Sequence, residues 1–234
     1  MKITIIGNSV ALRVRPPESY PNNKNYTYIL QEYYKTKALI ENKAIGASTI
    51  TDWLQKNDEV VNCFPDIYVL NLGVVDATVR ETPRWVNKLA NKSIDNVFSW
   101  LIKGIYHGPI AKMRPMLARI RGKKSWVSHK NFEKRFRSLV GLLLKETNAQ
   151  LIMMPINIAN ERVEKQLPGS KRNHFGFNEV IKRIAEDYNQ TFLELEDLES
   201  QTHYPDGVHF NAKGHKIVAD RLKTVIDKKI NKNS

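Results

Sequence analysis

The stretch KITIIGNSV, residues 2–10, is the clearest indication of the fold of this chain. Its run from Ile3 to Ile6 consists of β-branched residues and stops at a Gly-Asn-Ser turn. A short run of this kind, bounded by turn residues, is typical of a strand that is buried on both faces. The sequence therefore predicts a buried first strand, with Ser9 just beyond its carboxyl end.

Four further apolar runs follow, and segments with helical spacing of apolar residues separate them. The five predicted strands cover residues 3–6, 38–42, 67–72, 151–154 and 191–195. Strands that alternate with helices predict a parallel sheet covered by helices. We therefore expect an α/β protein: a three-layer α/β/α sandwich with a five-stranded parallel, flavodoxin-like sheet.

Helical spacing is found in five segments, and the last of them has Asn211 as a candidate N-cap. These segments cover residues 23–35, 48–61, 132–146, 178–189 and 211–230. We expect residues 1–234 to form a single domain. The interval from about 78 to 122 contains no good strand, and its amphipathic, basic sequence predicts a helical insertion after the third strand. Three interpretations of it stay open: helices packed on the core, a lid, or a helix at a membrane surface.

The chain is strongly basic, with 37 Lys and Arg against 24 Asp and Glu, a formal charge of +13. Such a charge favours nucleic acid, anionic lipid headgroups or acidic glycans as partners. No zinc-finger spacing, RNA-binding aromatic signature or recognition helix is found, so we do not expect a nucleic-acid partner. The six histidines form no tight ligand set, so we expect no metal. The apolar run near the start is too short for a signal peptide, which favours a cytoplasmic protein that can be peripheral to an anionic membrane.

In an open parallel sheet, functional residues lie at the carboxyl ends of the strands. Ser9 follows the first predicted strand, Gly46 follows the second, and Asp76 stands just beyond the third. Each also has a purely structural interpretation: a serine cap, a tight turn, and an acid at the start of a helix. Taken separately, these three positions do not identify a function.

The stretch YPDGVHFNAKGH, residues 204–215, follows the last predicted strand and adds an acid three residues before a histidine. An imidazole can activate a serine when a carboxylate fixes its tautomer. Gly207 permits the turn that brings the acid and the histidine together. A capping turn before Asn211 would explain the glycine but not the histidine. We therefore predict that Asp206, His209 and Ser9 form a catalytic triad.

Four blocks of the sequence together resemble the SGNH, or GDSL-type, hydrolases. The blocks are IIGNSV, Gly46, GVVD and DGVHFNAKGH, and they span most of the chain, up to His215. The resemblance implies that Ser9 is the nucleophile, His209 the general base and then acid, and Asp206 the orienting carboxylate. It implies an oxyanion hole made of the N–H groups of Ser9 and Gly46, with Ala47 as an alternative to Gly46. No metal or organic cofactor is implied.

Two blocks depart from the family pattern. Asn8 stands where the family usually has Asp, and Val75 stands where it has the Asn whose amide completes the oxyanion hole. Valine offers no donor, so either the site is weakened or another donor has replaced the amide. The arginines near these blocks are candidates for that donor, namely Arg13, Arg15, Arg80 and Arg84. Among them we favour Arg13 and Arg80, and we assign Arg13, Asp76 and Arg80 to substrate binding.

The variant blocks SVALRVRPP and GVVDATVR are similar to SGNH-like proteins associated with bacterial surface-polysaccharide synthesis. This resemblance implies an O-acyl group on a glycan, acidic or neutral, as the substrate. Hydrolysis and O-acyl transfer both fit, because they differ only in which acceptor reaches the acyl-enzyme. The alternative is a catalytically weakened SGNH-fold protein that binds a glycan or another partner.

Overall fold

The computed structural model describes residues 1–12, 24–91 and 97–232, and its centre is a five-stranded sheet of order β2-β1-β3-β4-β5. The strands are β1 (Lys2–Gly7), β2 (Leu39–Asn42), β3 (Ile67–Asn71), β4 (Gln150–Met153) and β5 (Thr191–Phe192). Each neighbouring pair is parallel. The predicted sheet and its α/β class are therefore confirmed.

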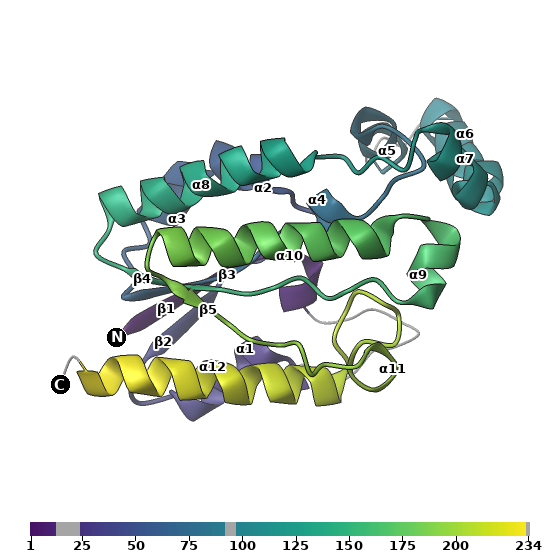
Figure 1. Cartoon of the computed structure of the whole chain (residues 1–234). Helices are drawn as coiled ribbons and strands as arrows, with labels where there is room; N and C mark the ends of the chain where they lie inside the picture. The colour runs from purple at the N-terminus through teal and green to yellow at the C-terminus, as the bar shows by residue number, and fades with distance from the viewer. Residues whose placement is uncertain (13–23, 92–96, 233–234) are drawn as a thin grey trace.

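Helices cover both faces of the sheet, as Figure 1 shows. One face carries α2 (Ile50–Gln55), α3 (Asn57–Val61), α8 (His129–Glu146) and α10 (Ser170–Asp187). The other carries α1 (Tyr26–Tyr33) and α12 (Ala212–Lys232). Two short helices, α9 (Glu161–Gln166) and α11 (Ser200–His203), lie near the carboxyl end of the sheet. The predicted three-layer arrangement is thus confirmed.

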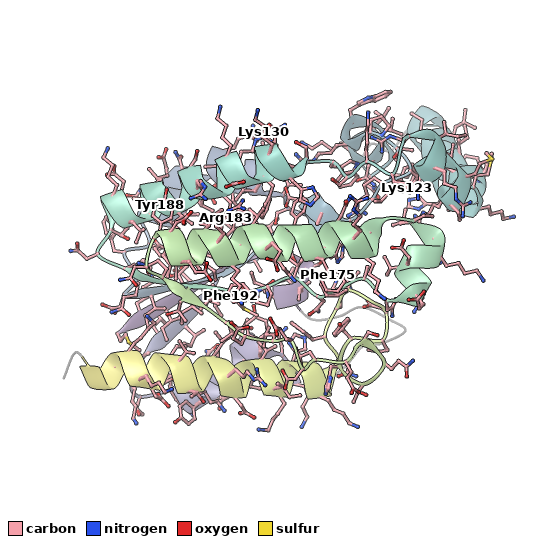
Figure 2. The ribbon with its side chains drawn as sticks, viewed as in Figure 1. Lys123, Lys130, Phe175, Arg183, Tyr188 and Phe192 are labelled. Carbon is pink, nitrogen blue, oxygen red and sulfur yellow. The ribbon has the colours of Figure 1, made fainter. Side chains whose placement is uncertain are left out.

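Burial of apolar side chains between the layers holds the sheet and the helices together. Ile3, Ile5 and Ile6 of β1 have no exposed surface, as expected of a central strand with helices on both faces. Between α8 and α10, the rings of Phe132 and Phe177 lie 4.5 Å apart. At the surface of the same helix pair, Arg183 and Glu133 form an ion pair, and Figure 2 labels Arg183 on α10. Exposed pairs of this kind add little free energy, so apolar burial dominates.

Three predicted elements differ most from the structure. The helix expected at 178–189 begins eight residues earlier, at Ser170. The strand expected at 191–195 ends at Phe192, because it lies at the sheet edge and pairs with β4 at only two positions. The helix expected at 48–61 is divided into α2 and α3. The division falls at Lys56, whose N–H bonds to the carbonyl of Trp53, three residues earlier, instead of continuing the α-helical pattern. Asn211 caps α12 as predicted, since its Oδ1 accepts the Gly214 N–H at 3.0 Å.

The interval after β3 is helical, as expected. It begins with α4 (Val74–Ala77) and continues with α5 (Arg84–Ala90), α6 (Val97–Ile105), a π-helical turn η3 (Tyr106–Ile110) and α7 (Arg114–Ile120). An antiparallel bridge between Val79 and Ser125 joins its two ends. Figure 1 places α5, α6 and α7 at the end of the molecule opposite the N-terminus. Because β1 starts at the N-terminus and the strands are parallel, the insertion lies at their carboxyl end.

Candidate active site

The turn after β1 holds Ser9 at the carboxyl end of the sheet, as the first residue of the 3-10 helix η1 (Ser9–Ala11). The side-chain oxygen of Asn8 accepts the N–H of Val10 at 3.1 Å and caps this helix. A Cβ atom at Gly7 would lie 3.0 Å from the Ala11 Cβ, so the tight turn favours glycine there. The Asn8 Nδ2 is buried and has no hydrogen-bond partner in the described part of the chain.

His209 joins Ser9 to Asp206 through two short hydrogen bonds. Its Nε2 lies 2.8 Å from the Ser9 Oγ, and its Nδ1 lies 2.7 Å from the Asp206 Oδ2. An ionised carboxylate can only accept, so Nδ1 carries the proton and Nε2 is free to accept from the Ser9 hydroxyl. Both distances are within the reach that general-base catalysis requires. The structure thus brings the three side chains together, although Ser9 and His209 are 200 residues apart in the sequence.

The carboxylate of Asp206 accepts two backbone hydrogen bonds in addition to the imidazole. Its Oδ1 accepts the N–H of Val208 at 2.8 Å and that of His209 at 2.7 Å. Partial burial acts to raise the pKa of Asp206, but the hydrogen bond from His209 and the two backbone N–H groups outweigh it. The pKa of Asp206 is therefore held below its ordinary value of 3.8. The group stays ionised at neutral pH and can stabilise an imidazolium.

Two asparagines that were not predicted from the sequence hold the loop that carries Asp206 and His209. Asn157 donates to the Val208 carbonyl at 2.8 Å, and Asn160 donates to the Pro205 carbonyl at 3.1 Å. Gly207 lies between these anchors with φ of 85°, and a Cβ there would come within 2.3 Å of the Asn160 side chain, so only glycine fits. A signal was present, since both asparagines follow the fourth predicted strand, whose carboxyl end faces the same edge.

The loop after β2 is attached directly to the turn that carries Ser9. The Ile45 N–H and the Ser48 Oγ both donate to the carbonyl of Gly7, at 3.0 and 3.3 Å. Between them, the N–H groups of Gly46 and Ala47 donate no hydrogen bond within the described residues. Ala47 has φ of 58°, in the left-handed region that non-glycine residues rarely adopt. Gly46 and Ala47, the two alternatives for the second oxyanion donor, thus have N–H groups that no described residue accepts. They lie in a strained loop that is hydrogen-bonded to Gly7, at the end of the strand before Ser9.

The sequence assigns Asp76 to substrate binding, and the structure places this residue in the interior of the protein. The residue has no exposed surface, and its carboxylate accepts the N–H of Ile50 at 3.1 Å. Burial raises the pKa of Asp76 to about 7, against the opposing effect of that N–H. Nearby, Asp52 accepts the N–H of Thr49 and pairs with Arg84. We infer that Asp76 fixes the start of α2, and with it the loop that precedes this helix.

The family's third oxyanion donor is an Asn amide, and Val75 stands at its position. The structure does not assign a replacement for that donor. Val75 is a buried residue of α4 and offers no donor. The Arg80 guanidinium lies 4.3 Å above the ring of Trp126, and its Nε has no hydrogen-bond partner among the residues described. Arg13 and Arg15 fall in the range 13–23, outside the described residues. Of the candidates, Arg80 therefore has a guanidinium without a carboxylate partner, whereas Arg84 is paired.

The sequence of the chain matches one family model, and its fold is similar to that of solved esterase structures. A model of the GDSL-like lipase/acylhydrolase family matches residues 5–217. No curated protein matches the chain significantly. Among solved structures, acetylxylan esterase Axe2 of Geobacillus stearothermophilus is 22% identical, with a TM-score of 0.60 over 95% of this chain and 92% of Axe2. The lipase/acylhydrolase of Enterococcus faecalis is 14% identical, with a TM-score of 0.65 over 97% and 96% of the two chains. Esterase EstA of Pseudoalteromonas sp. is 18% identical, with a TM-score of 0.60 over 98% of each. At these identities the structures show that the fold is shared.

Proposed function

The chain belongs to the GDSL-like lipase/acylhydrolase family, and we propose that it acts as a serine-dependent acyl-ester hydrolase whose nucleophile is Ser9. The observation that carries this proposal is the continuous chain of hydrogen bonds from the Ser9 hydroxyl through His209 to Asp206. A serine is a poor nucleophile until a neighbouring base removes its proton, and this arrangement supplies that base in the correct tautomer.

The mechanism follows from the positions of these groups. The Ser9 Oγ attacks the ester carbonyl carbon while its proton passes to the His209 Nε2, and Asp206 stabilises the imidazolium that forms. The N–H groups of Ser9 and Gly46 donate to the oxyanion of the tetrahedral intermediate. When the intermediate collapses, the carbon–oxygen bond to the leaving alcohol breaks and His209 returns the proton to that alcohol. Water then attacks the acyl-Ser9 ester, with His209 again as base, and releases the acid.

The acyl ester that we propose as substrate is an O-acetyl or similar small acyl group on a carbohydrate. Two observations support it: the resemblance of the first and third blocks to proteins of polysaccharide synthesis, and the shared fold with an acetylxylan esterase. Arg80, with its guanidinium unpaired by any described carboxylate, is a candidate contact for an acidic glycan. The same acyl-enzyme would serve an O-acyltransferase if a sugar hydroxyl replaced water as the acceptor.

Labelling with a fluorophosphonate tests the proposed nucleophile. Attack by the Ser9 Oγ forms a phosphorus–oxygen bond and expels fluoride, so intact-protein mass spectrometry should show one adduct, and peptide mapping should place it on Ser9. Denatured protein should not react, because unfolding separates the hydroxyl from its base. An adduct on any other residue, or none on folded protein that still cleaves esters, would reject Ser9 as the nucleophile.

Substituting Val75 with asparagine tests the altered oxyanion hole. If the hole simply lacks a donor, the restored amide should raise kcat by up to about 10²- to 10³-fold, the range typical of one oxyanion donor. If Arg80 has replaced the amide, Val75→Asn should have no effect or reduce the rate, and Arg80→Ala should reduce kcat. Arg80→Met is the matched control, because it keeps apolar packing over Trp126 and removes only the charge and the donors.

The same variants separate an enzyme from a protein that only binds. Wild-type rates in Val75→Asn, Arg80→Ala and Arg80→Met together would contradict both explanations of the hole. No ester turnover in the wild type, with turnover gained in Val75→Asn, would instead favour the weakened, partner-binding protein. The assay is the steady-state hydrolysis of p-nitrophenyl acetate.

A further inference from the structure

The helical insertion exposes an unusual amount of apolar surface. In the described part of the chain, eight of the fifteen exposed large apolar side chains lie between residues 85 and 120. The most exposed of these eight are Trp100 at 76%, Ile120 at 73% and Trp85 at 68%. Single exposed apolar residues are ordinary on protein surfaces, but a local concentration of large ones marks an interaction site.

The exposed apolar residues follow the helices as stripes. Positions four residues apart lie on the same face of a helix, and each of the three helices has such a pair. The pairs are Trp85 and Leu89 on α5, Leu101 and Ile105 on α6, and Met116 and Ile120 on α7. An apolar stripe on a helix normally packs against a core. Here the stripes remain exposed, so they are available to a partner.

Hydrogen bonds that do not involve these stripes stabilise the insertion. The Glu81 carboxylate is 5% exposed and accepts from Tyr106 at 3.3 Å and from Arg114 at 3.0 Å. Asn87 of α5 donates to the same tyrosine hydroxyl at 2.7 Å. These hydrogen bonds therefore link α5, η3 and α7 around the buried residues Glu81 and Tyr106. At the base of the insertion, Lys123 packs against Gly169 beside the start of α10 (Figure 2).

The surface around the stripes is basic. Residues 84–124 contain ten Lys and Arg and a single acid, Asp95, which lies outside the described residues. Lys88, Lys112 and Arg119 are exposed, and none of them forms an ion pair in the described part of the chain. Glu81, a buried acid just before this range, is already paired with Arg114. The face therefore combines apolar side chains with unpaired positive charge.

We propose that α5, α6 and α7 form a docking surface for a lipid bilayer that contains anionic headgroups. Interfacial helices have this composition: basic residues that attract anionic headgroups, and Trp, Leu or Ile side chains that enter the boundary of the acyl chains. A second copy of the chain fits less well, because a symmetric contact would bring two basic surfaces together. No helix in the described ranges has the length and apolar character needed to cross a bilayer. The proposed contact is therefore with the membrane surface, and it is independent of the catalytic proposal.

Co-sedimentation with vesicles tests the docking surface. The full chain should bind vesicles of phosphatidylcholine mixed with an equal part of phosphatidylglycerol, and bind much more weakly to phosphatidylcholine alone. Replacing Lys88, Lys112 and Arg119 with glutamine should lower the partition coefficient about a hundredfold at low salt. The loss should be smaller at high salt, because salt screens exposed charges. Trp100→Gln combined with Ile120→Gln should lower it too, and should reduce the blue shift of tryptophan fluorescence on binding.

Matched controls lie at the other end of the molecule. Lys35, Lys37 and Lys228 are also exposed, and their glutamine variants remove the same charge. Leu39→Gln with Phe64→Gln is the apolar control, since both side chains are exposed outside the insertion. All control variants, and Ser9→Ala, should bind vesicles as the wild type does.

Several results would overturn the docking surface. These are no binding to anionic vesicles at low salt, equal losses in the insertion and control variants, or unchanged binding in both insertion variants. Binding to an acidic polysaccharide but not to vesicles would assign the surface to a glycan instead. A concentration-dependent dimer that Trp100→Gln dissociates would assign it to self-association. Since Ser9→Ala separates binding from turnover, failure here leaves the proposed esterase intact, and failure of the esterase leaves the docking surface intact.

Discussion

Replacing Ser9 with alanine is expected to lower kcat by about 10⁴- to 10⁶-fold, both for p-nitrophenyl acetate and for an acetylated xylo-oligosaccharide. The methyl group cannot form the acyl-enzyme, and His209 then has no hydroxyl to deprotonate at 2.8 Å. The residual rate would come from the oxyanion donors acting on water. Steady-state release of p-nitrophenol and of acetate measures the two rates.

The fold should survive this substitution, because Ser9 contributes no side-chain hydrogen bond other than the one to His209 in the described structure. Circular dichroism and the thermal midpoint should therefore match those of the wild type. Ser138→Ala is the matched control, since Ser138 is an exposed serine of α8 whose hydroxyl bonds only to the Lys134 carbonyl. Wild-type turnover in Ser9→Ala, or an equal loss in Ser138→Ala, would show that the nucleophile is misassigned.

Most of the sheet could be predicted because burial on both faces leaves a local mark in the sequence. The strands around Ile3 and Val69 are short apolar runs between turn residues, and such runs report burial directly. The end of the fifth strand was harder to predict. Phe192 lies at the sheet edge, and Leu195 is buried although it lies beyond the last paired residue. Alternation of apolar residues reports burial, but pairing depends on where the neighbouring strand ends.

The hydrogen bonds that join Ser9, His209 and Asp206 could be predicted for a different reason. Asp206 and His209 lie within one loop, so their spacing alone predicts that they meet, and only Ser9 had to be placed by the topology of the sheet. Asn157 and Asn160 gave no comparable pattern, because each bonds to a backbone carbonyl some fifty residues away. Their position after the fourth predicted strand indicated the correct edge of the sheet. A side chain that bonds to the backbone needs no complementary residue type, however, so the sequence did not identify the carbonyls that they bind.

Asp76 shows what reasoning from strand ends leaves undetermined. The rule that functional groups gather at the carboxyl ends of strands placed this acid at the correct edge. It did not say which way the side chain points, and the structure turns it inward to the N–H of Ile50. The same edge therefore carries both the groups that we propose to react and the groups that hold their loops, and only tertiary contacts distinguish the two.

Replacing Asp206 with asparagine should lower kcat by about 10⁴-fold, and the hydrogen bonds around it give the reason. Oδ1 of Asp206 accepts two backbone N–H groups, from Val208 and His209, so the amide oxygen of an asparagine would be held at that position. Its NH₂ group would then face the His209 Nδ1, where Oδ2 now lies at 2.7 Å. An NH₂ group can only donate, so Nδ1 would lose its proton and Nε2 would carry it. In that tautomer Nε2 cannot accept the Ser9 proton.

The measurements are kcat for p-nitrophenyl acetate and the tautomer of His209 from its ring-nitrogen NMR shifts. Asp206→Asn should convert the ring to the Nε2–H form while the loop stays folded, because both backbone hydrogen bonds persist. Asp58→Asn, at an exposed aspartate of α3, makes the same chemical change without contacting the site and should leave both readouts at wild-type values. If Asp206→Asn keeps the Nδ1–H tautomer and yet loses activity, the carboxylate acts through its charge and not by fixing the tautomer. If it keeps full activity, Asp206 does not orient His209 for catalysis, and the proposed mechanism fails.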